Sequence, residues 1–313
     1  MNKIISVIIP FFNECENLEA IYQELLEAHR THFNHVVLEI ILMDNHSDDG
    51  SYDIALKLAK NDNRLRVVRL SRNFGYQANI LTGYLSARGD AVVQLDADGE
   101  DDPRLIAEFI KHWERGFKVV YGIRKQRQEP TLIALQRKLF YRLVNALSPH
   151  PVPIDAGDFR LIDRDVVCSL QKFKEANPYL RGLITLVGYA QVGIPYERRA
   201  RLRGISKFSW WDYLRLAWDG ITSQSRAPLA FAGWLSFIFL FISVSGFFFY
   251  LALHLSHGRV IPGFTTMILV QFFMTGMQML ILGIFGTYIG RIFDEVKARP
   301  RYIIESQYPP EPE

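Results

Sequence analysis

The sequence predicts an α/β protein with a mainly parallel sheet, followed by two helices that span a membrane. Runs rich in Val, Ile and Leu alternate with helical patterns over residues 1–225, and such alternation is typical of parallel α/β sheets. Residues 227–258 and 260–290 contain no Asp, Glu, Lys or Arg. Both stretches exceed the roughly 20 apolar residues that a membrane span needs.

The expected elements of the first domain follow in order along the chain. Strands are expected at 4–10, 36–43, 65–70, 91–95 and 118–122, and helices at 14–30, 51–60, 76–88 and 103–116. Ligands of parallel sheets bind beyond the carboxyl ends of the strands, so the polar residues after each strand are candidates for a site. The sequence has no P-loop and no GxGxxG fingerprint, which disfavours a nucleoside triphosphatase or a dinucleotide oxidoreductase.

The membrane part is expected to follow a juxtamembrane helix. The predicted parts are a catalytic domain at 1–205, an interfacial helix at 206–226, two spans with a short external loop at 227–290, and a tail at 291–313. Arg226 precedes the first span and several cations follow the second, so the positive-inside rule places both termini in the cytoplasm. A second amphipathic segment, residues 131–148, is either interfacial or an ordinary core helix. Glycines in the second span permit close packing, including a homo-oligomer.

Charge and composition restrict the partners. The net charge is +3, but residues 124–142 and 198–226 each carry a net +5. Such local basic segments favour a phosphate ligand or an anionic membrane surface over nucleic acid. The two cysteines, Cys15 and Cys168, are expected to be buried thiols, and residues 305–313 are expected to be disordered.

The stretch "AVVQLDADGEDDP" (91–103) places five acids directly after an apolar strand. Carboxylates this close repel one another unless a cation offsets them. Asp96 and Asp98, two residues apart, are expected to bind Mg²⁺ or Mn²⁺, which accepts one or two carboxylates and completes its shell with water and phosphates. A solvated turn is the alternative. Asp101 or Asp102 is expected to cap the following helix.

Several motifs, taken together, resemble family 2 inverting glycosyltransferases with the GT-A fold. They are "VIIPFFNE", "DNHSDDG", "RNFGYQA", "QLDAD", "GDFRLIDR" and "RRARLRGISKF". The C-terminal "GTYIGRIFDEVKARPRY" looks like the polyprenyl-phosphate branch, which includes bactoprenol glucosyltransferases and dolichyl-phosphate-mannose enzymes. The resemblance implies a Rossmann-like GT-A domain that transfers one sugar from a nucleoside diphosphate donor to polyprenyl (undecaprenyl) phosphate, with inversion. It also implies a multi-pass protein of the plasma (inner) membrane.

The resemblance also suggests roles for individual residues. Donor binding falls to Pro10, Asn13, Glu14, Asp44, Gln77 and Asp96, metal binding to Asp96 and Asp98, catalysis to Asp98 and Asp158, and binding of the acceptor phosphate to Arg198, Arg201, Ser206 and Lys207. A phosphate acceptor is already ionised near neutrality because its second pKa is about 6. We therefore expect Asp158 to orient the acceptor or the sugar more than to accept a proton.

Alternatives exist for some of these residues. Glu14 fits a helix cap, Gln77 a structural loop residue, and the basic segment a membrane-facing patch. Arg160 and Arg164 are expected to pair with Asp155, Asp163 or Asp165. Many relatives read Asp-Asp-Gly-Ser where this chain has Asp44, Asn45, His46 and Ser47.

Two other functions compete with this one. The first is a two-span subunit of a lipid flippase, but the spans lack the charged residues that usually mark a transport path. The second is a processive glycan synthase, which commonly carries a Gln-x-x-Arg-Trp motif that is missing from this sequence. We favour a uridine nucleotide and a glucose-like sugar as the donor only because they are common among such enzymes, and no residue of the sequence identifies them.

Overall fold

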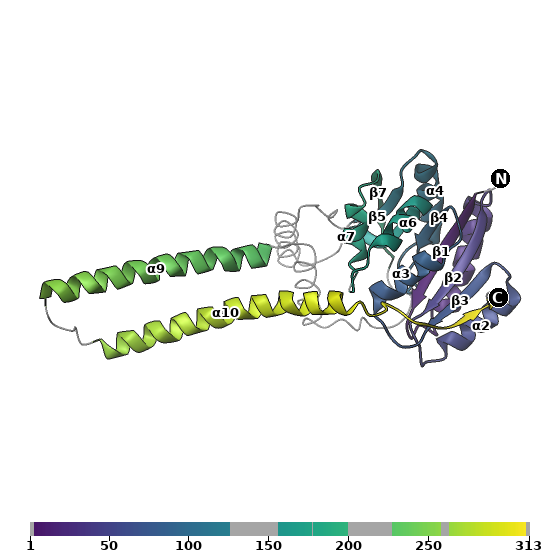
Figure 1. Ribbon diagram of the computed structural model, residues 1–313. Coiled ribbons are helices and arrows are strands. Elements are labelled where there is room, and N and C mark those ends of the chain that lie inside the picture. The colour runs from purple at the N-terminus through teal and green to yellow at the C-terminus, as the bar shows by residue number, and fades with distance from the viewer. Residues whose placement is uncertain (1–2, 126–155, 177, 200–226, 258–262, 311–313) are drawn as a thin grey trace. The chain divides into compact units, whose positions relative to one another are not determined.

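An eight-stranded mixed sheet forms the first part of the molecule (Figure 1). The computed structural model describes residues 3–125, 156–176, 178–199, 227–257 and 263–310. The strands are β1 (Ile4–Phe11), β2 (Val37–Asp44), β3 (Leu65–Leu70), β4 (Ala91–Gln94), β5 (Val119–Lys125), β6 (Ala156–Asp163), β7 (Gln191–Glu197) and β8 (Ile304–Tyr308). Their order across the sheet is β7-β5-β6-β4-β1-β2-β3-β8.

The parallel centre of the sheet sets the position of the loops. Strand β1 pairs in parallel with β2 and β4, and β2 with β3, so four strands end at one edge. Strand β6 runs antiparallel to both β4 and β5, and β8 runs antiparallel to β3. The predicted mainly parallel α/β fold is therefore confirmed, with antiparallel strands added on both sides.

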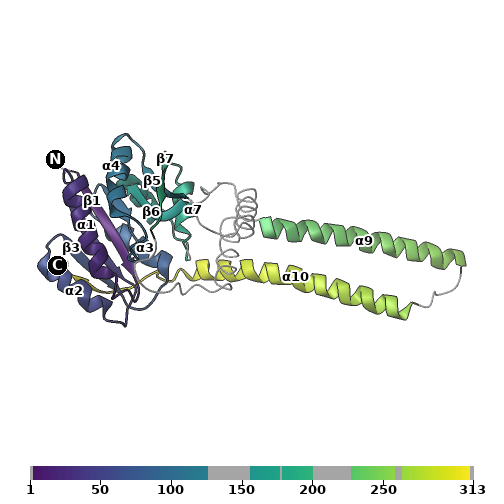
Figure 2. The ribbon, with the colours of Figure 1, turned by 180° about the vertical axis from the view of Figure 1, so that it is seen from behind.

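Helices cover both faces of this sheet (Figure 1 and Figure 2). On one face lie α1 (Leu18–His32), α2 (Ser51–Asn61) and α4 (Ile106–Glu114), and on the other α3 (Tyr76–Ser86), α6 (Arg164–Lys172) and α7 (Leu180–Leu186). Strand β1 contributes side chains to the hydrophobic cores on both faces, because its side chains alternate in direction. Ile5, Val7 and Ile9 pack with the first set of helices, and Ile8 packs with the second. Because successive side chains point to opposite faces and both faces are covered, the whole strand is apolar.

A second compact unit contains two long apolar helices, α9 (Ala227–His257) and α10 (Phe264–Lys297). Within them, Pro228–Gly246 and Phe273–Lys297 are long and apolar enough to cross a membrane. The described side chains of these segments are largely exposed, whereas the core helices of a soluble domain are mostly buried. The rings of Phe239 and Phe273 lie 5.8 Å apart between the two helices.

The structure corrects several expectations outside the central strands. Residues 304–308 are an ordered strand, so the prediction of disorder from Glu305 onward is wrong there. Cys15 is half-buried and Cys168 exposed, so neither is a buried thiol. Helix α1 begins at Leu18, four residues later than expected, because residues 14–17 form a turn in which the Glu14 carbonyl accepts hydrogen bonds from the amides of Asn17 and Leu18.

Candidate functional site

The loops after β1 and β2 are joined at the carboxyl edge of the sheet. Phe11 lies in register with Asp44, and the Asn45 amide donates to the Phe11 carbonyl at 3.1 Å. The Asn13 side chain exchanges hydrogen bonds with Asp48, donating to its carboxylate at 2.8 Å and accepting from its amide at 3.0 Å. Asn13 has a left-handed backbone with φ of 57°, which asparagine tolerates better than most residues. Asn13 therefore fixes the shape of this edge.

The predicted donor residues on β1 and its loop take different positions. Pro10 lies within β1, in register with Met43 of β2. The Glu14 amide donates to Ser51 Oγ at 2.9 Å, and its carboxylate accepts from the Asn17 side chain at 2.7 Å. These bonds place Glu14 in the turn before α1, but the N-cap of that helix is Asn17 and not Glu14.

Asp44 ends β2 as a fully buried carboxylate with one unused oxygen. Its Oδ1 accepts from the Ser47 amide at 2.8 Å, whereas Oδ2 accepts no hydrogen bond from the described residues. Arg69 Nε lies 3.5 Å from Oδ2. Burial raises the pKa of Asp44, and the hydrogen bonds from Ser47 and the charge of Arg69 act against that rise. An unused buried acceptor at the edge of the sheet suits a ligand N–H group.

The loop after β3 is held by the residues that depart from the family pattern. The Asn45 side chain donates to Asn73 Oδ1 at 2.8 Å and accepts from the Phe74 amide at 3.0 Å. Gln77, in contrast, accepts from the Leu180 amide at 3.2 Å and so joins α3 to the start of α7. Gln77 thus makes a structural contact, but from helix α3 and not from a loop as the alternative expected.

The acidic loop after β4 brings three carboxylates together. Asp96 Oδ1 accepts from the Tyr76 hydroxyl at 2.6 Å and from Nε2 of the Gln94 side chain at 2.8 Å. Burial and the negative charges of Asp101 and Asp98 raise the pKa of Asp96 to about 7. Asp98 accepts from the Glu100 amide at 3.1 Å, which closes the turn.

Asp101 and Asp102 have separate roles. Asp102 accepts from the Arg104 amide at 3.0 Å and caps the short helix η1 (Pro103–Leu105). Asp101 is fully buried, accepts a hydrogen bond from the Tyr196 hydroxyl and has one oxygen without a hydrogen-bond partner among the described residues. The expected cap is therefore Asp102, and Asp101 is a buried member of the acidic cluster.

The chemistry of this loop suits a divalent cation that a ligand helps to hold. In the described part of the chain, no group of three or more His, Cys, Asp and Glu side chains is arranged to bind a metal by itself. Magnesium and manganese need only one or two protein carboxylates when phosphates supply other ligands. Asp96 and Asp98 would provide those carboxylates, and a bound cation would offset the burial and the negative charges that raise the pKa of Asp96.

Asp158 lies on β6 and forms a bidentate ion pair that the sequence did not suggest. Arg181 of α7 donates from Nε and Nη2 to its two carboxylate oxygens at 2.8 and 2.6 Å. Burial alone would raise the pKa of Asp158, but the charge and hydrogen bonds of Arg181, with help from Arg160, lower it. Asp158 is therefore held ionised. The motif "NPYLRG" contains Arg181, yet nothing in its pattern marks that arginine as a partner of a distant aspartate.

Two neighbouring arginines take other partners than those expected. Arg160 donates to the Gly157 carbonyl at 2.8 Å and lies 3.7 Å from Asp158. Arg164 donates to the Gly89 carbonyl at 2.8 Å through Nε. The expected pairs of Arg160 and Arg164 with Asp163 or Asp165 are therefore wrong, and Asp163 binds Trp113 and Lys118 instead. Asp155 lies outside the described residues.

One of the predicted phosphate-binding residues reaches the acidic loop. Arg198 forms an ion pair with Glu100, and its Nε lies 3.6 Å from Asp101. Arg201, Ser206 and Lys207 lie outside the described residues, as do the expected amphipathic segments at 131–148 and 206–226.

Comparisons with known proteins agree with this architecture. The family described as "Glycosyl transferase family 2" matches residues 6–170. An uncharacterized glycosyltransferase, YkcC of Bacillus subtilis, is 39% identical over 308 residues, covering 97% of this chain and 94% of the relative. A bactoprenol glucosyl transferase of Shigella phage SfII is 33% identical over 310 residues, covering 97% of this chain and 98% of the relative.

A solved structure shares the fold at low identity. Glucosyl-3-phosphoglycerate synthase from Mycobacterium tuberculosis, in complex with Mn²⁺, uridine diphosphate and glucosyl-3-phosphoglycerate, is 19% identical with a TM-score of 0.50. The match covers 71% of this chain and 80% of that one. The similarity of sequence along nearly the whole chain, together with the family match, leads to one conclusion: the protein is a glycosyltransferase of family 2, with the GT-A fold.

Proposed function

We propose that the protein transfers one hexose, preferably glucose, from a uridine-diphosphate sugar to polyprenyl phosphate with inversion. The observation that carries this proposal is the cluster of Asp96, Asp98 and Asp101 beyond β4, where burial and neighbouring negative charges raise the pKa of Asp96 and Asp101, so that a cation bound beside Asp96 and Asp98 would stabilise the ionised carboxylates. The name of the bactoprenol glucosyl transferase supports a polyprenyl acceptor. The complex of the mycobacterial synthase supports a divalent metal with a uridine nucleotide.

The donor would lie across the carboxyl edge of the sheet. Asp44 Oδ2 would accept a hydrogen bond from an N–H group of the nucleobase, with Pro10 and Asn13 shaping the pocket. Asp96 and Asp98 would hold Mg²⁺ or Mn²⁺ against the diphosphate. When bound there, the metal would act as a Lewis acid that offsets charge on the leaving group.

The acceptor phosphate would enter near Asp158. Because this phosphate is largely ionised at pH 7, Asp158 would orient the reactants, and Arg181 would keep its carboxylate charged and fixed. Arg198, Arg201, Ser206 and Lys207 would bind the acceptor phosphate, since arginine binds phosphate bidentately and lysine acts as a point charge. Arg198 would then exchange its contact with Glu100 for the phosphate.

Two spans would anchor the enzyme in the membrane. Helices α9 and α10 have the length and composition of spans, and the cations on either side of the apolar region favour cytoplasmic termini. In this orientation the product, a lipid-linked sugar phosphate, would form on the cytoplasmic leaflet of the plasma membrane.

The test is direct synthesis. Full-length protein in detergent is incubated with undecaprenyl phosphate, Mn²⁺ or Mg²⁺ and a panel of uridine- and guanosine-diphosphate sugars, and the lipid is analysed by mass spectrometry. The proposal expects one glycosylated lipid phosphate, which an Asp96→Ala, Asp98→Ala double variant does not form. Release of the nucleotide without a lipid product would contradict polyprenyl phosphate as the acceptor. No turnover of any donor sugar would contradict the proposed transfer activity.

A further inference from the structure

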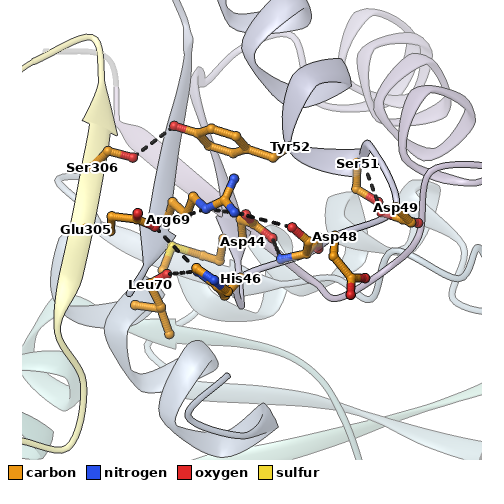
Figure 3. A network of polar contacts seen from close by, with 12 residues as sticks. Asp44, His46, Asp48, Asp49, Ser51, Tyr52, Arg69, Leu70, Glu305 and Ser306 are labelled. Atoms are coloured by element: carbon orange, nitrogen blue, oxygen red, sulfur yellow. Dashed lines mark hydrogen bonds and ion pairs between the residues drawn. The ribbon is translucent and has the colours of Figure 1, made fainter. Parts of the chain in front are cut away.

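Strand β8 brings a carboxylate to the wall of the proposed donor site (Figure 3). The strand pairs antiparallel with β3, with Arg69 opposite Ser306, and the Ser71 amide donates to the Ile303 carbonyl at 2.9 Å. The hydroxyls of Tyr52 and Ser306 lie 2.9 Å apart, which ties β8 to α2. The backbone pairing of β8 with β3 holds Glu305 beside the end of β2, although Glu305 lies far from Asp44 in the sequence.

Arg69 lies between two competing carboxylates. Its Nε is 3.1 Å from Glu305 Oε2 and 3.5 Å from Asp44 Oδ2. Its guanidinium also stacks on the Tyr52 ring, 4.3 Å from the centroid, and Nη2 donates to the Ser47 carbonyl at 3.3 Å. The guanidinium is thus positioned near Asp44 without forming a hydrogen bond to Oδ2.

Glu305 also contacts the residue that replaces the glycine frequent in the family. His46 has a left-handed backbone with φ of 66°, and its Nδ1 lies 3.1 Å from the Leu70 carbonyl and 3.4 Å from Glu305 Oε2. Both neighbours are acceptors, so Nδ1 carries the hydrogen in this arrangement. The same carboxylate therefore restrains two side chains that flank Asp44.

We propose that Glu305 is a positioning residue for the nucleotide: it keeps Arg69 from donating to Asp44 Oδ2, so that this buried oxygen stays without a protein donor and can pair with an N–H group of the base. This inference rests on the proposed role of Asp44 in donor binding. Without Glu305, the guanidinium would close the remaining distance and donate to Oδ2, because charge-assisted pairs prefer shorter separations. The nucleotide would then have to displace Arg69 before it could bind.

The test compares variants of the full-length protein in detergent. The probe is uridine diphosphate with Mn²⁺, followed by isothermal titration calorimetry, and steady-state kinetics give KM for the donor separately from kcat. We expect Glu305→Ala to raise both Kd and KM about fivefold, a typical loss for a partly exposed charged contact, and to leave kcat within about twofold. Glu305→Gln, which keeps the shape but not the charge, should give an intermediate Kd.

Two controls separate positioning from general effects. Ser306→Ala removes the link to Tyr52 on the same strand, and Glu108→Ala removes a carboxylate from α4 that pairs only within its own helix among the described residues. Both should bind the nucleotide like the wild type. The decisive comparison is made in the Arg69→Met variant. Once Arg69 is absent, adding Glu305→Ala should not weaken nucleotide binding further.

The outcomes are distinct. Unchanged Kd and KM in Glu305→Ala would overturn the inference, as would an equal loss of affinity in Ser306→Ala or an undiminished effect of Glu305→Ala in the Arg69→Met background. A wild-type protein that binds neither uridine nor guanosine diphosphate would instead contradict the proposed function itself. If only guanosine diphosphate binds, the same series is measured with it.

Discussion

Arg181 and Asp158 form a bidentate ion pair between α7 and β6, with both hydrogen bonds at 2.8 Å or shorter. The pair keeps the pKa of Asp158 below its usual range in spite of burial. The carboxylate should therefore remain ionised through the neutral and mildly acidic range. We expect the wild-type value of kcat/KM to show no loss at acid pH that is due to Asp158.

Replacing Arg181 should expose the effect of burial. In Arg181→Met the pKa of Asp158 rises, so activity should fall as the pH is lowered through the new value, in addition to a general loss from poorer orientation. The pH profile of kcat/KM measures both effects. Asp158→Asn is the control: an acid limb in the wild type that disappears in this variant would show that Asp158 acts as a base.

Tyr196 supports the acidic loop from β7. Its hydroxyl donates to Asp101, and its ring packs 6.0 Å from the Phe159 ring, centroid to centroid. Tyr196→Phe keeps the ring but leaves the buried Asp101 with fewer donors, which should cost about 1–3 kcal/mol of stability. Thermal denaturation in detergent measures the loss. Tyr189→Phe, at an exposed tyrosine, is the matched control; equal melting of both variants would contradict the assigned role of Tyr196.

His46 has a backbone conformation that glycine adopts without strain. At φ of 66° a non-glycine residue costs about 1 kcal/mol. His46→Ala keeps this cost and loses the contacts of the ring with Leu70 and Glu305, whereas His46→Gly loses the contacts but removes the strain. We therefore expect His46→Gly to melt at a higher temperature than His46→Ala. The reverse order would show that the loop relaxes when the ring is removed.

Asp62 should make the free energy of unfolding of the sheet domain depend on pH at acid values. Burial would raise its pKa, but hydrogen bonds from Arg64 and Tyr22 lower the pKa to about 2, below the ordinary 3.8. A depressed pKa in the folded state stabilises the protein above the unfolded pKa, and that contribution disappears as the pH falls toward 2. Because the pair with Arg64 is partly exposed, the effect should be about 1 kcal/mol.

The measurement compares the wild type with Asp62→Asn across pH. The wild type should be the more stable protein near neutrality, and the difference should shrink between about pH 4 and pH 2. A difference in stability that stays constant over this range would contradict the depressed pKa.

The central strands were predictable because their signal is local. Buried parallel strands appear as apolar runs such as Ile4–Phe11, and the polar residues after them had to meet at one edge because parallel strands end together. The acidic loop was predicted for the same reason. The later strands were missed: β6 contains Gly157, Asp158 and Arg160, and β7 includes Gly193 and Pro195, so neither gives an apolar run.

The partners of charged residues could not be predicted, because they depend on tertiary distance. Arg181 lies 23 positions from Asp158, and Glu305 contacts Arg69 only because β8 joins the far edge of the sheet. The sequence of the tail, with its prolines and acids, indicated disorder. Pairing with β3 supplies the backbone hydrogen bonds that the isolated segment lacks.

The position of β8 in the chain also imposes an order on biosynthesis. The ribosome makes β1–β7 first, then both apolar helices, and only afterwards the residues that pair with β3. Until then, β3 is an open edge strand, the kind of surface on which foreign strands add and aggregates start. A chain interrupted after α10 would keep its acidic loop but leave the edge of β3 uncovered. The sheet can therefore be completed only after both apolar helices have been translated.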